Sequence, residues 1–333
     1  PYTTLFRSRV MRKIQFPNLI CSIVIIAALL AVSGSGCSGE SGPAQSPAAE
    51  SSAAGSETQA AEDIPDTHFE TSYRETVFSE EYAEGNEEVW LDISHSQDGY
   101  FGVYSDSDAR LKLQVIKDDV TYTYDLTPQT LDYFPFQSGN GSYNIRVMKN
   151  LEGKKYFELY SAVADVTLAS VYEPYLRCGQ YARYTRGSEC VALACELAGS
   201  ASSAEDFIYK VYDRVCSSIT YDYDKAELEL TGYIPDPDDT LRTGKGICFD
   251  YASLAASMLR SQGIPVKIIF GYVAPDDLYH AWNMFYVEGA GWTSVKFVQD
   301  ANDWSRMDLT FSANGANADF IGDGSNYTDI YQY

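Results

Sequence analysis

The 333-residue sequence predicts an α+β protein in which a β-rich part precedes a part that mixes helices and strands. Residues 66–170 contain short runs of β-branched and aromatic residues separated by turn signals. From Pro174 onward, apolar residues recur instead at helical spacing. One cysteine, Cys248, stands between a glycine-containing turn and such a helix. The chain is long enough to bury two cores, so we expect two domains.

The N-terminal region predicts targeting rather than fold. Residues 1–10 precede Met11 and resemble sequencing-adaptor read-through, so we expect them to be an artefact. Residues 11–37 place a basic pair before an apolar run and end in small residues at Cys37, as a secretory signal does. The apolar run is shorter than the roughly 20 residues that span a membrane.

The small residues before Cys37 resemble the processing site of bacterial lipoproteins, in which the cysteine is acylated. Gly34 stands where that pattern prefers Leu, so ordinary signal cleavage remains an alternative. Residues 38–65 are rich in Ser, Ala, Gly and Glu, which predicts a disordered linker. We therefore expect an extracytoplasmic lipoprotein, anchored to the membrane through Cys37 on a bacterial cell surface.

The charge balance limits the partners. The chain has 24 Lys and Arg against 47 Asp and Glu, a formal net charge of −23. Such a surface repels phosphate backbones, so we expect no nucleic-acid partner.

Residues 66–172 predict a small antiparallel β-sandwich, because strand-like runs alternate with turns such as those around Gly99 and Gly153. His68 and His95 lie in polar surroundings, which favours solvated surface positions over ligands. We expect this domain to bind a partner or act as a spacer, and its sequence identifies no ligand.

Residues 173–333 predict the second domain. Residues 203–219 favour a helix, since Ser203 is followed three residues later by Asp206 and the apolar residues share one face. The polar segment 231–246 predicts a loop whose acidic run, 236–239, is solvated.

Five cysteines lie beyond the targeting segment. We expect Cys190, Cys195 and Cys216 to be inert core residues of helices. An odd number in an exported chain leaves at least one unpaired within it. A disulfide between Cys178 and Cys248 is one alternative role for these two residues.

Cys248 stands at a predicted helix N-terminus. The apolar residues after it follow helical spacing, and Gly263 and Pro265 mark the end of the helix. Unpaired N–H groups at a helix start carry roughly half a positive charge, which favours thiolate over thiol. Gly244 and Gly246 would let the chain approach a substrate closely.

His280 opens the second of two predicted strands, 266–273 and 279–288, and is the one histidine after His95. A strand–loop–strand return would bring it to Cys248, where its imidazole could exchange a proton with the thiol. A lone Cys and a lone His leave a structural role open for both residues.

"GKGICFDYASLAASMLRSQGIPVKIIFGY", followed by "HAWNMFYVEGAGW", resembles the transglutaminase-like superfamily over about residues 205–295. The resemblance implies a papain-like core in which a helix headed by a cysteine packs on an antiparallel sheet. It also implies a Cys-His-Asp triad, with Cys248 as nucleophile and His280 as base. No cofactor is expected, and no metal.

The sequence offers three aspartates for the third triad position. The family places an Asp a few residues after the Gly-Trp pair, but the first Asp after Trp292 is Asp300. "WSRMDLTF" resembles the family segment displaced by an inserted hairpin, so we prefer Asp308, with Asp300 second and Asp303 third. A surface turn remains the alternative for Asp308.

An oxyanion would need the Cys248 N–H and one further donor. Tyr221 or Trp282 could donate or line the cleft, and Trp282 could equally form a wall.

We therefore expect a cell-envelope thiol enzyme that attacks protein or peptide amides, cell-wall peptides included, through a Cys248 thioester. The sequence leaves transglutaminase and peptidase or amidase activity open. The alternative is an inactive surface adhesin or scaffold that binds through the β-sandwich.

Overall fold

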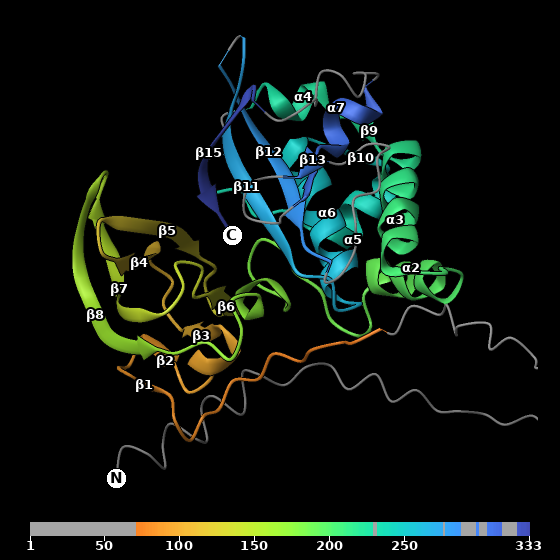
Figure 1. Cartoon of the computed structure of the whole chain (residues 1–333). Coiled ribbons are helices and arrows are strands. Elements are labelled where there is room, and N and C mark those ends of the chain that lie inside the picture. The colour runs from red at the N-terminus through yellow and green to blue at the C-terminus, as the bar shows by residue number, and fades with distance from the viewer. Residues whose placement is uncertain (1–70, 229–231, 276, 288–297, 300–304, 315–324) are drawn as a thin grey trace, which may run out of the picture. The chain divides into compact units, whose positions relative to one another are not determined.

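The computed structural model describes residues 71–228, 232–275, 277–287, 298–299, 305–314 and 325–333 (Figure 1). The described residues belong to one compact unit, Thr67–Tyr333. The predictions for residues 1–10, 11–37 and 38–65 and for His68 lie outside the described residues. Across the part of the chain that is described, we find no helix with the length and apolar character of a membrane span.

Two four-stranded antiparallel sheets form the β-rich part. Their strand orders are β1-β2-β3-β6 and β5-β4-β7-β8. The bounds are β1 Glu84–Gly85, β2 Val89–Asp92, β3 Tyr100–Ser105, β4 Leu111–Lys117, β5 Val120–Leu126, β6 Leu131–Pro135, β7 Gly141–Glu152 and β8 Lys155–Val166.

One hydrophobic core joins the two sheets, as the predicted sandwich requires. On β4, Leu111, Leu113 and Val115 are buried while the residues between them are partly exposed, the two-residue period of a strand with one buried face. These side chains share a cluster with Phe101 of β3 and Phe134 of β6. The domain boundary at 172/173 stays a prediction, because residues 67–333 form one compact unit.

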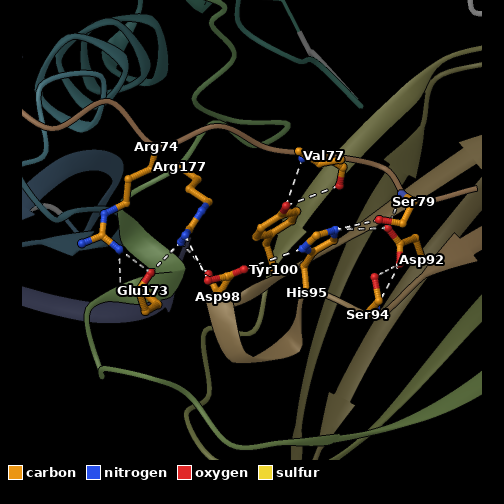
Figure 2. A network of polar contacts seen from close by, with 10 residues as sticks. All are labelled: Arg74, Val77, Ser79, Asp92, Ser94, His95, Asp98, Tyr100, Glu173 and Arg177. Atoms are coloured by element: carbon orange, nitrogen blue, oxygen red, sulfur yellow. Dashed lines mark hydrogen bonds and ion pairs between the residues drawn. The ribbon is translucent and has the colours of Figure 1, made fainter. Parts of the chain in front are cut away.

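The prediction that His95 is a solvated surface residue is wrong. Its Nε2 lies 3.1 Å from Ser79 Oγ, and its ring stacks on Tyr100 with 5.0 Å between centroids. Figure 2 shows this side chain inside a polar network beside Asp92, a buried carboxylate that accepts from the Ser79 N–H. His95 therefore helps to fix the segment that precedes the sandwich.

The same network ties the sandwich to the segment that comes after its last strand (Figure 2). Glu173, in the 3-10 helix η2 Glu173–Tyr175, is buried and pairs with Arg74 and Arg177 at 2.6 Å each. Arg177 also donates to the carbonyl of Asp98, in η1 Ser96–Asp98, at 2.7 Å. Both arginines neutralise a carboxylate that would be costly to bury alone.

The rest of the described chain combines helices with a five-stranded antiparallel sheet of order β13-β14-β12-β11-β15. Its helices are α2 Glu189–Gly199, α3 Ala204–Ser218, α4 Tyr223–Ala226, α5 Pro237–Thr243, α6 Cys248–Arg260 and α7 Leu309–Ala313. The strands in this part of the chain are β9 Thr220–Tyr221, β10 Lys245–Gly246, β11 Val266–Val273, β12 Leu278–Phe285, β13 Val298–Gln299, β14 Ser305–Met307 and β15 Tyr327–Gln332.

Helix α6 packs against β11 and β12 of this sheet (Figure 1). Leu254 and Leu259 of α6 share a buried cluster with Val266, Ile268 and Ala281 of the two strands. The α+β class and the core of a helix on an antiparallel sheet are confirmed. No residue of α6 is exposed, and its polar residues Asp250, Ser253, Ser257 and Arg260 are buried.

Local signals explain two helix starts. The Ser203 side chain accepts from the Asp206 N–H, which confirms the predicted cap of α3. The prediction that 231–246 is a loop is wrong in part, because α5 begins there with Asp236 as its cap and Pro237 at its first position. Asp238 accepts from the Glu189 and Cys190 N–H groups at the start of α2, so this acid caps a second helix.

The cysteines follow the prediction only in part. Cys190 is buried, Cys216 is partly buried and Cys195 is exposed, so the core role predicted for Cys195 is wrong. None of the described cysteines forms a disulfide, Cys178 and Cys248 included, which contradicts a disulfide between those two.

Candidate active site

Cys248 occupies the first position of α6, with Ile247 as the cap residue. An α-helix leaves the N–H groups of its first turn without intrahelical acceptors. The Cys248 side chain is neither fully buried nor fully exposed, so a nucleophile at this place is open to a substrate. The predicted location of Cys248 at a helix start is confirmed.

A two-stranded parallel pair fixes the chain just before Cys248. Strand β9 lies beside β10, with Tyr221 opposite Gly246, and the Asp222 N–H donates to the Gly246 carbonyl at 3.0 Å. A Cβ at Gly246 would lie 2.6 Å from the Cβ of Asp250. This glycine therefore permits close packing within the protein, not the approach of a substrate that its sequence suggested.

Asp250 anchors the same turn, and sequence analysis did not find it. Its buried carboxylate accepts from the Ile247 N–H at 2.8 Å and from Lys225 Nζ at 2.6 Å, and the Tyr233 hydroxyl is a third donor. Removing one member of such a buried set leaves a charge unpaired, which typically costs about 3–5 kcal/mol. Asp250 thus fixes the residue before Cys248 without being placed to react.

His280 lies between Cys248 and Asp308. Its Nε2 is 2.9 Å from Oδ2 of Asp308, and Cys248 lies close enough for its side chain to raise the pKa of His280. Because Asp308 occupies Nε2, Nδ1 is the ring nitrogen left for the sulfur. His280 is 3% exposed and Asp308 is fully buried, so water screens this pair little.

Strand pairing explains how Asp308 reaches His280. Strand β14 pairs with β12 through Met307 and Asn283, so the next residue, Asp308, emerges beside the start of β12. Strand β13 pairs in turn with β14, as a hairpin inserted before this segment would. Asp300 and Asp303, the second and third choices, lie outside the described residues.

Tyr327 is a further partner of Asp308 that sequence analysis missed. Its hydroxyl donates to Oδ2, the oxygen that also binds His280, at 2.9 Å. The Tyr327 ring is buried and packs edge-on against Trp282, with centroids 4.9 Å apart. No local sequence signal could have found Tyr327, because it reaches the site by pairing of β15 with β11.

The surroundings of His280 favour its charged form. Burial opposes the imidazolium, but the charge of Asp308 and the hydrogen bonds from Asp308 and Cys248 outweigh it, which raises the pKa of His280 from 6.5 to about 10. Because the folded pKa lies above the unfolded one, the stability from this protonation is complete below pH 6.5 and is lost as pH rises through about 10. At neutral pH an imidazolium, which can exchange a proton with a substrate group, therefore lies beside Cys248.

Tyr221 and Trp282, the two residues predicted to donate to an oxyanion or line the cleft, differ in exposure. Tyr221 is partly exposed, and burial, followed by the charge of Cys248, raises its pKa to about 12, so its hydroxyl stays a donor at neutral pH. Trp282 is 1% exposed and stacks on His280, with centroids 6.2 Å apart. Trp282 therefore supports the imidazole and does not form an open cleft wall.

The described residues contain no group of three or more His, Cys, Asp and Glu side chains arranged to hold a metal ion. The chemistry that these side chains themselves support is nucleophilic attack by sulfur with proton transfer through imidazole.

Comparisons with known proteins give one family match, since the model of the transglutaminase-like superfamily matches residues 191–297. The UPF0252 protein PH1321 of Pyrococcus horikoshii is 37% identical over 81 residues, which are 24% of this chain and 24% of that protein. The match thus spans about a quarter of the curated relative.

Solved structures show lower similarity. A candidate cysteine protease from Cytophaga hutchinsonii is 16% identical, with 70% of this chain and 91% of that chain covered and a TM-score of 0.35. The periplasmic domain of TgpA from Pseudomonas aeruginosa is 14% identical, with coverage of 73% and 75% and a TM-score of 0.31. These likenesses are too weak to support an argument about activity. The family match includes Cys248 and His280, and the chain therefore contains a transglutaminase-like domain over residues 191–297.

Proposed function

We propose that the protein is an acyl-transfer enzyme that attacks protein or peptide amides with the Cys248 thiolate. The observation that carries the proposal is the buried hydrogen bond of His280 with Asp308, together with a Cys248 close enough to raise the pKa of His280. Transglutaminase-like proteins are typically cysteine-dependent enzymes, and the family match supports this class. We propose Cys248, His280 and Asp308 as nucleophile, acid–base and orienting residue.

The proposed reaction has two steps. The Cys248 sulfur attacks the amide carbonyl, the C–N bond breaks, and the leaving amine takes a proton from the His280 imidazolium, which leaves a thioester. An amine or water then gives a proton to His280 and attacks the thioester, which releases the thiolate. The Cys248 N–H and the Tyr221 hydroxyl are the proposed donors to the oxyanion in both steps.

The acceptor decides between two activities: an amine gives cross-linking, as in a transglutaminase, and water gives hydrolysis. The described residues favour neither. The alternative is an inactive scaffold, and the hydrogen bond between Asp308 and His280 supports the enzyme over it.

We further propose that the enzyme works outside the cytoplasm on a lipid anchor, which rests on the signal and tether pattern of residues 11–65. In a bacterial host, fatty-acid labelling of the protein should depend on Cys37. Equal labelling of Cys37→Ala and wild type would contradict the anchor.

Replacing the nucleophile should abolish activity. We expect Cys248→Ala to lose more than about 1,000-fold in both hydrolysis of a peptide amide and incorporation of dansylcadaverine into casein, because no thioester can form. Cys195→Ala removes an exposed cysteine outside the site and should keep full activity. If wild type is active in an assay and Cys248→Ala is equally active there, this mechanism is excluded.

Removing the Tyr327 hydroxyl should weaken the orientation of Asp308. Tyr327→Phe keeps the ring that packs on Trp282, so we expect the free energy of unfolding to fall by about 1 kcal/mol and kcat by about tenfold. Urea unfolding and steady-state kinetics measure the two effects.

Tyr143→Phe is the matched control. Tyr143 donates to the Gly139 carbonyl at 2.7 Å within the sandwich, so its loss should cost similar stability but leave kcat unchanged. A proportional loss of kcat in both variants would show that Tyr327 acts only through stability.

A further inference from the structure

Three tyrosines lie exposed at one end of the core sheet. Tyr272 of β11 is 43% exposed, Tyr279 of β12 is 52% exposed and Tyr331 of β15 is 39% exposed. We call these three residues the tyrosine shelf. Clusters of exposed aromatic side chains on a folded protein commonly mark a binding surface, and the proposed mechanism uses none of the three.

Strand register places the shelf on the face that α6 covers. Tyr272 pairs with Tyr279, and Tyr331 pairs with Phe270, so these side chains share one face of the sheet. Phe270 packs against the cluster that contains α6, which identifies that face. The shelf is therefore the part of the α6 face that the helix leaves open.

Ring contacts connect the shelf to the nucleophile. Phe249, the residue after Cys248, lies 4.8 Å from Phe270 between ring centroids. Phe270 lies 6.1 Å from Tyr279, and Tyr279 lies 5.5 Å from Tyr272. The aromatic rings thus form a continuous path from the start of α6 to the exposed surface.

Electrostatics support the same proximity. Burial raises the pKa of Tyr279 first, and the charges of Tyr272, Tyr331 and Cys248 raise it further. These charge effects agree with the ring contacts that place Tyr279 between Tyr272 and the start of α6.

An acidic side chain lies beside the shelf. Asp277 directly precedes β12, the strand that carries Tyr279, and is exposed. A substrate with acidic residues beside its reacting amide would meet like charges here, whereas neutral aromatic residues would meet tyrosine rings.

We propose that the tyrosine shelf binds aromatic side chains of an extended peptide substrate, next to the amide that Cys248 attacks. This inference rests on the proposed function and names its substrate class: peptides with aromatic and without acidic residues beside the reacting amide. The tyrosine rings supply flat apolar area with hydroxyls at their edge, which suits stacking against aromatic rings. Tyr279 is the central contact because its ring lies between Tyr272 and Phe270, and Phe270 in turn contacts Phe249, the residue after Cys248.

Peptide binding to the full chain carrying Cys248→Ala tests the proposal without turnover. Fluorescein-labelled Gly-Phe-Gln-Phe-Gly, Gly-Ser-Gln-Ser-Gly and Gly-Asp-Gln-Asp-Gly are compared by fluorescence anisotropy. We expect the aromatic peptide to bind about tenfold more tightly than the serine peptide, and the acidic peptide to bind most weakly.

Shelf variants in the same background locate the preference. Tyr272→Ala and Tyr279→Ala should each reduce it to below about threefold, and Tyr279→Phe, which keeps the ring, should retain it. Tyr82→Ala, a 61% exposed tyrosine elsewhere, is the matched control and should leave it unchanged.

Two results would overturn the shelf: equal binding of the three peptides, or an unchanged preference in both alanine variants. Failure of the proposed function is a separate result, because it appears as absent turnover in the chain that keeps Cys248. A preference that depends on the shelf, without turnover, would leave the binding surface established and refute the enzyme.

Discussion

The hydrogen bond between His280 and Asp308 is the interaction on which the site depends. Both side chains are almost fully buried, so neither would be stable there as an isolated charge. Together they keep an imidazolium at neutral pH, and that imidazolium lies beside Cys248. The reactivity proposed for Cys248 therefore depends on a carboxylate that the thiol does not itself touch.

The fold supplies each member of this site from a different element. Helix α6 presents Cys248 at its start, β12 presents His280, and the end of β14 presents Asp308. Two further residues hold the site in place. Asp250 anchors the turn before Cys248, and Tyr327 donates a hydrogen bond to the Asp308 oxygen that also binds His280. Edge strand β15 is thus part of the site although it carries no reacting group.

Local sequence signals identified Cys248 and His280 because both stand at the ends of clearly patterned elements. Asp308 could be ranked first only through family resemblance, since an acid in a turn has no pattern of its own. Sequence analysis did not find Asp250 and Tyr327, because their roles arise from contacts between elements. The same reason explains Asp238, whose acidic run gives no sign that its carboxylate caps α2, a helix far away in sequence.

Alkylation of Cys248 by iodoacetamide across pH tests the central claim most directly, with peptide mass spectrometry to separate it from exposed Cys195. An ordinary thiol, with a pKa of about 8.5, reacts about 50-fold more slowly at pH 6.5 than at pH 8.5. We expect the alkylation rate of Cys248 in wild type to fall less than about threefold from pH 8.5 to pH 6.5. In His280→Ala the rate at Cys248 should fall as that of an ordinary thiol does. A wild-type rate that falls about 50-fold would contradict the account.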